Sequence, residues 1–142
     1  MIDANILVYA VDVDAPQHAA CRHLLETARD PATTLYLTSQ ILCEFYSVIT
    51  NPRGVAAPRT PAEALAAISA LLKLPGIHVL PATVRTVPRL MELLQRRPVT
   101  GGDVFDVQLV ATMQANDVER IYTFNIEDFA VFPELTVIAP RA

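Results

Sequence analysis

The sequence predicts an α/β fold in which a parallel sheet carries helices on both faces. Two observations support this prediction. Short apolar segments of strand length alternate with segments that gather apolar residues on one helical face, and the alternation continues along all 142 residues. No internal repeat, low-complexity tract or linker interrupts it, so we expect one domain with one core over residues 1–142.

The first predicted strand covers residues 2–9, where Asp3 and Asn5 interrupt an apolar run. It starts almost at residue 1, as a shortened or misassigned N-terminus would. The other strands are expected at residues 34–38, 77–80, 120–124 and 135–138. Ligands of such sheets bind beyond the carboxyl ends of the strands, so residues at those ends are candidates for a site.

The predicted helices are defined by their terminal residues. Pro16 opens the first helix, and Asp30-Pro31 ends it. Thr60-Pro61-Ala62-Glu63 is a capping box with proline at the first helical position. Ser39 and Asp103 are expected to cap the helices that follow them. The predicted helices cover residues 16–29, 40–50, 61–74, 83–97 and 103–116.

The composition excludes several classes of protein. A hydrophobic content of 52% excludes a disordered chain, and no apolar run reaches the roughly 18 residues of a membrane span. No signal peptide is visible, so the expected location is the cytoplasm. A net charge of −4 argues against a general nucleic-acid coat but not against a nuclease, because a bound metal reverses the local sign of an acidic site. The basic residues available near such a site are Arg53, Arg59, Arg85, Arg89, Arg96 and Arg97.

Other chemistries lack their motifs. The four glycines form neither a dinucleotide-binding nor a Walker motif. No Cys/His spacing resembles a zinc site, and Cys21 and Cys43 are expected to be buried free thiols. His18, His23 and His78 are scattered without partner spacing, which disfavours a histidine general base. Serine catalysis is disfavoured because no hydroxyl lies in a Gly-x-Ser-x-Gly context.

Acidic residues at the junctions of strands and helices point to metal chemistry. Burying a lone carboxylate is costly, so a cluster of them implies a bound cation or an unusual proton. Hard oxygen ligands suit Mg²⁺ or Mn²⁺, which act on phosphates. The primary candidates are Asp3, Glu44, Asp103 and Asp106, and the secondary candidates are Asn5, Thr123, Asn125 and Asp128.

Each candidate also has an ordinary structural explanation. Asp106 lies among apolar positions of its helix, which a solvated aspartate should avoid, although the helix dipole favours an acid there. Asp103 suits an N-cap, and Glu44 lies at the edge of an apolar arc. Asp3 suits a strand-end turn. Asn125 and Asp128 can cap a short helix or hydrogen-bond a metal-bound water.

Four segments, in this order, resemble the PIN domain family and, within it, VapC-type toxins. The first is Asp3-Ala4-Asn5-Ile6-Leu7, and the second runs from Thr38 to Phe45. The third runs from Asp103 to Thr112, and the fourth joins Thr123-Phe124-Asn125 to Asp128-Phe129. Each motif alone is weak, but four at suitable spacing are fairly specific.

The resemblance implies a three-layer α/β/α sandwich with a mostly parallel sheet and Mg²⁺- or Mn²⁺-dependent ribonuclease activity. It further implies a homodimer and a cognate antitoxin, with RNA as substrate and tRNA as one candidate. Asp3, Glu44 and Asp106 match the most characteristic acidic positions, with Asp3 and Asp106 as the direct metal ligands. Asn125 stands where many members carry aspartate, so Asp103 or Asp128 would have to compensate.

Two alternatives remain open at this point. One is an aspartyl-phosphate phosphotransferase or phosphatase with Asp3 as nucleophile. The other is a non-catalytic PIN-like module that binds RNA or a partner protein.

Overall fold

The computed structural model describes all 142 residues and contains two pairs of parallel strands. In the first pair β1 (Leu35–Thr38) lies beside β2 (Ile77–Leu80), with Leu35 opposite Ile77. In the second pair β3 (Arg120–Tyr122) lies beside β4 (Thr136–Ile138), with Arg120 opposite Thr136.

The N-terminal residues join the two pairs. The backbone N–H of Ile2 donates to the Tyr36 carbonyl of β1 at 2.9 Å, and that of Asp3 donates to the Tyr122 carbonyl of β3 at 3.0 Å. Ile2 and Tyr122 form a parallel bridge. The spatial order is therefore β2, β1, residues 1–3, β3 and β4, and both strand pairs and the Ile2–Tyr122 bridge are parallel.

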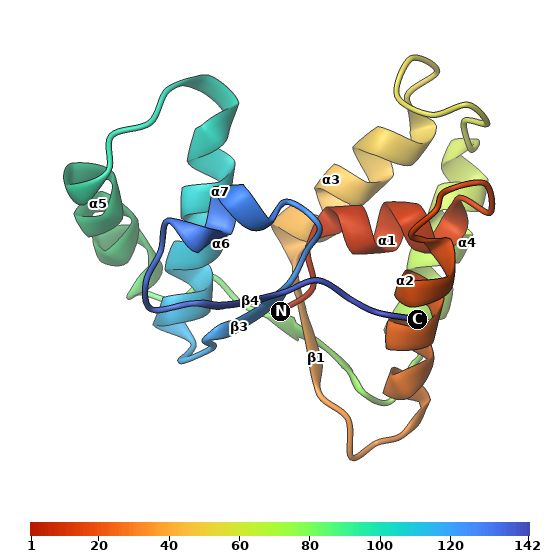
Figure 1. Cartoon of the computed structure of the whole chain (residues 1–142), viewed down its shortest axis with the longest axis horizontal. Helices are drawn as coiled ribbons and strands as arrows, with labels where there is room; N and C mark the ends of the chain where they lie inside the picture. The colour runs from red at the N-terminus through yellow and green to blue at the C-terminus, as the bar shows by residue number, and fades with distance from the viewer.

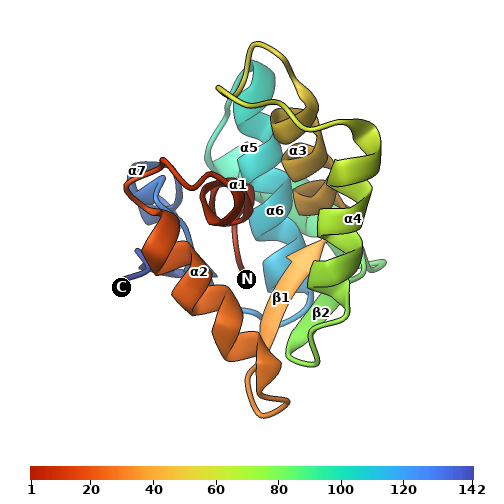
Figure 2. The ribbon, with the colours of Figure 1, turned by 90° about the vertical axis from the view of Figure 1, so that its right-hand side faces the viewer.

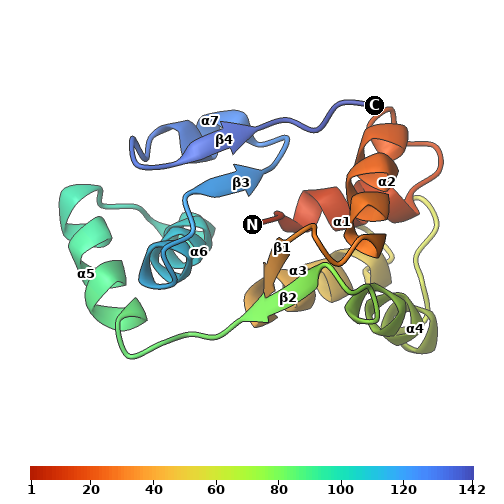
Figure 3. The same ribbon diagram turned by 90° about the horizontal axis from the view of Figure 1, so that it is seen from below.

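Helices cover both sides of these strands. Figures 1 and 3 show α5 and α6 on one side, with α1, α2 and α4 on the other. Figure 2 shows α1 end-on, with α2 running past it and β1 and β2 side by side beneath α4. The predicted α/β/α sandwich with a parallel sheet is therefore confirmed. The helices are α1 (Ala4–Val11), α2 (His18–Glu26), α3 (Ser39–Thr50), α4 (Pro61–Leu72), α5 (Thr86–Arg96), α6 (Val104–Ala115) and α7 (Ile126–Ala130).

The first predicted strand is wrong over most of its length, because residues 4–11 form α1. The Asp3 carboxylate accepts a hydrogen bond from the Ala4 N–H and so begins the helix one residue after the sheet contact. Ile6, Leu7 and Ala10 are buried, which is helical spacing. A short apolar run does not distinguish a buried strand from a buried helix, and the N-cap decided between them here.

Two predicted caps are also corrected. Thr38 rather than Ser39 caps α3, since its hydroxyl oxygen accepts from the Ile41 N–H at 3.2 Å. Asp103 ends a short 3₁₀ turn, Gly101–Asp103, and does occupy the N-cap position of α6, but its side chain makes no capping bond. The capping box at Thr60 and Glu63 is confirmed.

The core is one cluster of 26 buried residues centred on the sheet and α6. α6 is buried on nearly all sides because it lies between the strands and α5. Both cysteines are free, and Cys21 is buried as expected, but Cys43 is exposed because it lines an open hollow between α1 and α3. No helix is both long and apolar enough to cross a membrane.

Candidate active site

Asp3 lies at the carboxyl edge of the sheet, and only 7% of it is exposed. Its Oδ1 accepts the hydrogen bond from the Ala4 N–H at 2.7 Å. Its Oδ2 accepts from Asn5 Nδ2 at 2.8 Å and from the Thr123 hydroxyl at 2.7 Å. Thr123 follows β3, so the contact joins the two ends of the chain. The orientation of this carboxylate is therefore fixed by three donors.

A negative charge on Asp3 is costly at this position. Burial raises the pKa of the Asp3 carboxyl, and the carboxylates of Glu44 and Asp128 raise it further. The hydrogen bonds from Thr123 and Ala4 act in the opposite direction but do not restore the ordinary value. A cation nearby would stabilise the ionised form.

Asp106 is half-buried on the first turn of α6. Burial raises the pKa of the Asp106 carboxyl to about 6, and four other carboxylates add to the effect, in the order Asp3, Asp128, Glu44 and Asp103. No neighbouring group lowers this pKa. Because Coulombic coupling weakens with distance, residues predicted from four separate segments converge in the folded chain.

Glu44 is half-buried on α3 and is held by a residue that the sequence analysis missed. Gln40 Nε2 donates to Glu44 Oε1 at 2.7 Å and to the Phe105 carbonyl at 2.8 Å. This amide therefore orients Glu44 and ties α3 to the start of α6. The available signal was spacing, since Gln40 precedes Glu44 by one helical turn.

Asp103 and Asp128 are both exposed, and both line a cavity of about 170 Å³ beside Asp106. Asp128, from α7, raises the pKa of both Asp3 and Asp106, whereas Asp103 acts on Asp106 alone. Of the two candidates for a fourth acidic position, Asp128 is therefore the more closely coupled to the cluster. The remaining residues that line this cavity are Arg97, Val99, Val107, Glu127, Val131 and Phe132.

Asn125 faces a different hollow, a wide one of about 640 Å³ between α1 and α3. Asn5, Tyr9 and Glu44 line this hollow as well. The Asn125 backbone N–H donates to the Thr123 hydroxyl oxygen at 3.0 Å, and its side chain does not cap α7. The carboxylate cluster thus lies between two hollows, with Glu44 on one and Asp106 on the other.

The donor atoms suit a hard divalent cation, because they are carboxylate oxygens. Burial first, and neighbouring carboxylates second, raise the pKa of Asp3 and of Asp106. As the side chains lie, however, no three acidic, histidine or cysteine residues are close enough to hold a metal ion between them. Asp3 is fixed by its donors, while Glu44, Asp106 and Asp128 are more accessible. A metal held by these side chains as they lie would therefore take one or two carboxylates and complete its shell with water.

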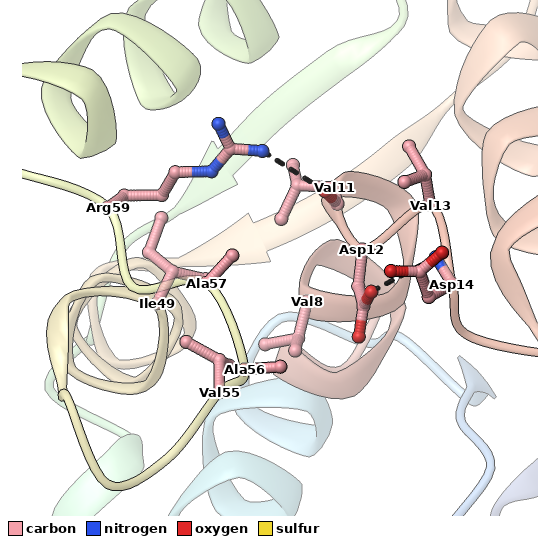
Figure 4. Close-up of a pocket in the computed structure, with 10 residues that line it drawn as sticks. All are labelled: Val8, Val11, Asp12, Val13, Asp14, Ile49, Val55, Ala56, Ala57 and Arg59. Atoms are coloured by element: carbon pink, nitrogen blue, oxygen red, sulfur yellow. Dashed lines mark hydrogen bonds between the residues drawn. The ribbon is translucent and has the colours of Figure 1, made fainter.

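A smaller hollow of about 100 Å³ lies at the other end of α1 and is shown in Figure 4. Valine, isoleucine and alanine side chains make up most of its wall, and Arg59 Nη2 donates across it to the Val11 carbonyl at 3.4 Å. Its acids, Asp12 and Asp14, are joined to each other by the Asp14 N–H bond to Asp12. None of the predicted site residues lines it.

Comparison with protein families matches residues 1–135 to the PIN domain. The chain belongs to the PIN domain family. Ribonuclease VapC43 of Mycobacterium tuberculosis is 33% identical over 116 residues, which make up 82% of this chain and 79% of that protein. The resemblance drawn from the four motifs, including that to VapC-type toxins, is confirmed.

Solved structures show the same fold at lower identity. VapBC2 of Rickettsia felis, bound to a DNA fragment from its promoter, superimposes with a TM-score of 0.70 at 19% identity, covering 99% of this chain and 98% of that one. VapC20 of Mycobacterium tuberculosis, described as a Sarcin-Ricin loop cleaving toxin, also gives 0.70, at 16% identity and 98% coverage of both chains.

Proposed function

We propose that this chain is a metal-dependent endoribonuclease and the toxin of a toxin–antitoxin pair. The observation that carries the proposal is the electrostatic convergence of Asp3, Glu44, Asp106 and Asp128 at the carboxyl edge of the sheet. Membership of the PIN family and a relative named as a ribonuclease support the choice of RNA as substrate.

The proposed role of each residue follows from how firmly its side chain is held. Asp3 presents a fixed carboxylate as one metal ligand, and Asp106 presents a second that is ionised at neutral pH. Glu44, oriented by Gln40, completes the ligand shell or orients the attacking water. Asp128 is the better candidate for the fourth acid. When bound, Mg²⁺ or Mn²⁺ would lower the pKa of a water molecule and stabilise negative charge on the phosphate.

Substitution of Asp106 tests this assignment. Asp106→Asn keeps the shape of the side chain but removes a ligand charge, so it should abolish cleavage of RNA in Mg²⁺ or Mn²⁺. Asp14→Asn is the matched control, because Asp14 is exposed beside the apolar hollow. EDTA should stop the wild-type reaction, and added Mn²⁺ should restore it. Wild-type rates in purified Asp106→Asn would show that the assignment is wrong.

The alternative functions make different predictions. An aspartyl-phosphate enzyme needs a nucleophile that a phosphate group can reach, but Asp3 is only 7% exposed. A metal ion needs only one lone pair, and Oδ1, which accepts a single hydrogen bond, retains one. A phosphorylated protein that survives an acid quench and loses its phosphate to hydroxylamine would nevertheless establish the aspartyl-phosphate mechanism. RNA binding without metal-dependent turnover would establish the non-catalytic module.

An antitoxin is the proposed protein partner. The site is rich in carboxylates, so a cationic side chain is suited to block it, and arginine pairs with carboxylates bidentately. The affinity of the antitoxin for this chain should fall when Asp3 or Asp106 is neutralised. The chain expressed alone should arrest growth, and the product of the adjacent upstream gene should restore it. An active nuclease that is harmless alone and has no neighbour that binds it would refute the toxin assignment only.

A homodimer is also part of the proposal. The candidate contact is the apolar face of α4 that carries Leu65, Ile68, Leu71 and Leu72. Leu71 is buried in the core, but Leu65 and Leu72 are 57% and 43% exposed on the outer side. These two residues, two turns apart, support a contact with a second copy. Light scattering that reports only monomer at tens of micromolar would contradict it.

We further infer a single domain over residues 1–142 in the cytoplasm. The single buried cluster, which draws residues from Met1 to Phe132, supports one cooperative unit. A single transition in both thermal and urea unfolding, followed by two spectroscopic probes, is the expected result.

A further inference from the structure

The cavity beside Asp106 contains one basic residue among its lining residues, and that residue is Arg97. It caps the carboxyl end of α5, where its backbone N–H donates to the Leu93 carbonyl at 2.8 Å. Its side chain is exposed. The same cavity is lined by four acidic residues, so an unpaired arginine among its lining residues requires an explanation.

Most other arginines named from the sequence already have partners. Arg85 pairs with Asp117 at 3.7 Å, and the Arg89–Glu92 pair is at 2.6 Å. Arg96, the immediate neighbour of Arg97, pairs with Glu134 at 3.6 Å. Arg59 donates to the backbone of α1 beside the apolar hollow. Arg53 has no ion pair, but it does not line the carboxylate cavity.

Arg97 does not neutralise the carboxylates around it. It forms no ion pair with any of them, although Asp103, Asp106, Glu127 and Asp128 share its cavity. Every charged neighbour that affects Asp106 raises its pKa, and Arg97 is not among the groups that act on it. The guanidinium group therefore does not face Asp106, although Arg97 lines the same cavity, and it forms no ion pair, so it remains available to another anion.

We propose that Arg97 is a phosphate-binding residue of the active site and holds the RNA backbone against the carboxylate cavity. This inference rests on the proposed ribonuclease function. An acidic cavity repels a polyanion, and a guanidinium group on its wall offsets that repulsion at the place where the reacting phosphate must approach. Its planar fork of N–H donors can contact two phosphate oxygens at once. A cavity of about 170 Å³ also leaves room beside Asp106 for more than one water molecule.

The test compares Arg97→Gln with Arg96→Gln. Both variants lose one positive charge at the same end of α5, so general electrostatics and the helix dipole are matched. The substrate is a 40-nucleotide RNA pool of random sequence, cleaved under enzyme excess in Mn²⁺ at several NaCl concentrations. The measured quantities are the maximal rate and the enzyme concentration that gives half of it.

Arg97→Gln should raise the half-saturating concentration roughly tenfold and leave the maximal rate within about threefold. The slope of log affinity against log salt should become shallower by about 0.7, the value of one phosphate contact on a single strand. Arg96→Gln should change neither quantity, and Arg97→Lys should recover part of the affinity but less than the wild type.

Two controls separate this role from a structural one. Arg97→Gln should keep the wild-type melting temperature and bind Mn²⁺ without RNA at least as tightly. Equal behaviour of Arg97→Gln and Arg96→Gln, an unchanged salt slope, or weakened Mn²⁺ binding would overturn the assignment of Arg97 alone. If the wild type shows no metal-dependent cleavage of the pool, the proposed function fails, and this inference fails with it.

Discussion

The hydroxyl of Thr123 donates a hydrogen bond of 2.7 Å to the Asp3 carboxylate from 120 residues away in the sequence. The same oxygen accepts from Asn5 Nδ2 and from the Asn125 N–H, each at 3.0 Å. One buried hydroxyl thus satisfies three groups where the N-terminal segment and β3 lie side by side. The fourth motif therefore contributes to the site through a threonine that orients the first acid.

Removing this hydroxyl should weaken both the fold and the metal site. Thr123→Val preserves the side-chain volume. It removes the acceptor of the Asn125 N–H and one of the two donors to Asp3 Oδ2. We expect a loss of about 1–3 kcal/mol in the free energy of unfolding, measured in urea. The pKa of Asp3 should rise, because the Thr123 bond lowers it, and Mn²⁺ affinity should fall. Thr123→Ser keeps the hydroxyl and is the control; equal stability of the two variants would rule out this role.

The raised pKa of Asp106 predicts a pH dependence of stability. The carboxyl has a pKa of about 6 in the folded chain and an ordinary value of 3.8. The folded state therefore holds this proton more tightly, and the metal-free protein should lose stability as pH rises from about 4 through 6. Because Asp106 is only half-buried, solvent screening limits the change to about 1 kcal/mol.

Asp106→Asn should remove this dependence. In EDTA the variant should be more stable than the wild type at pH 7.5, and the difference should shrink towards pH 4. In Mn²⁺ the order should reverse, since the wild type gains binding energy that the variant lacks. Thermal unfolding of the wild type and the variant at pH 4 and at pH 7.5, each in EDTA and in Mn²⁺, measures these differences. A difference that stays constant between pH 4 and pH 7.5 in EDTA would contradict the shifted pKa.

Gln40 offers a test of how Glu44 is oriented. Gln40→Leu removes both amide bonds, to Glu44 Oε1 and to the Phe105 carbonyl, while keeping much of the side-chain volume. The maximal cleavage rate should fall about tenfold, because Glu44 then samples several rotamers. Gln40→Glu places a like charge beside Glu44 and should lower the maximal cleavage rate further than Gln40→Leu does. Gln95→Leu, at an exposed position of α5, serves as control. An unchanged rate in Gln40→Leu would show that Glu44 needs no support.

The sequence predicted the layers correctly because they follow from local patterns, and it drew attention to the acidic residues for the same reason. Alternating strand and helix signals give the parallel sandwich, and carboxylates next to apolar runs are conspicuous. The assignment of residues 4–11 failed because a short apolar run suits either element. Gln40 and Arg97 could not be singled out, because their roles depend on which side chains lie across a gap between elements. Spacing within one helix does not contain that information.

One internal defect of α6 gives a prediction about stability alone. The Gln114 amide has both its nitrogen and its oxygen buried without a hydrogen-bond partner. Burying an unpaired polar group costs about 1–3 kcal/mol, so Gln114→Met, which keeps the volume and removes the polar atoms, should stabilise the chain by about 1–2 kcal/mol. Gln95→Met, at an exposed position, should change the unfolding free energy by less than about 0.5 kcal/mol. Cleavage activity should not change in either variant. A destabilised Gln114→Met would show that the amide has a partner in solution, such as an ordered water molecule.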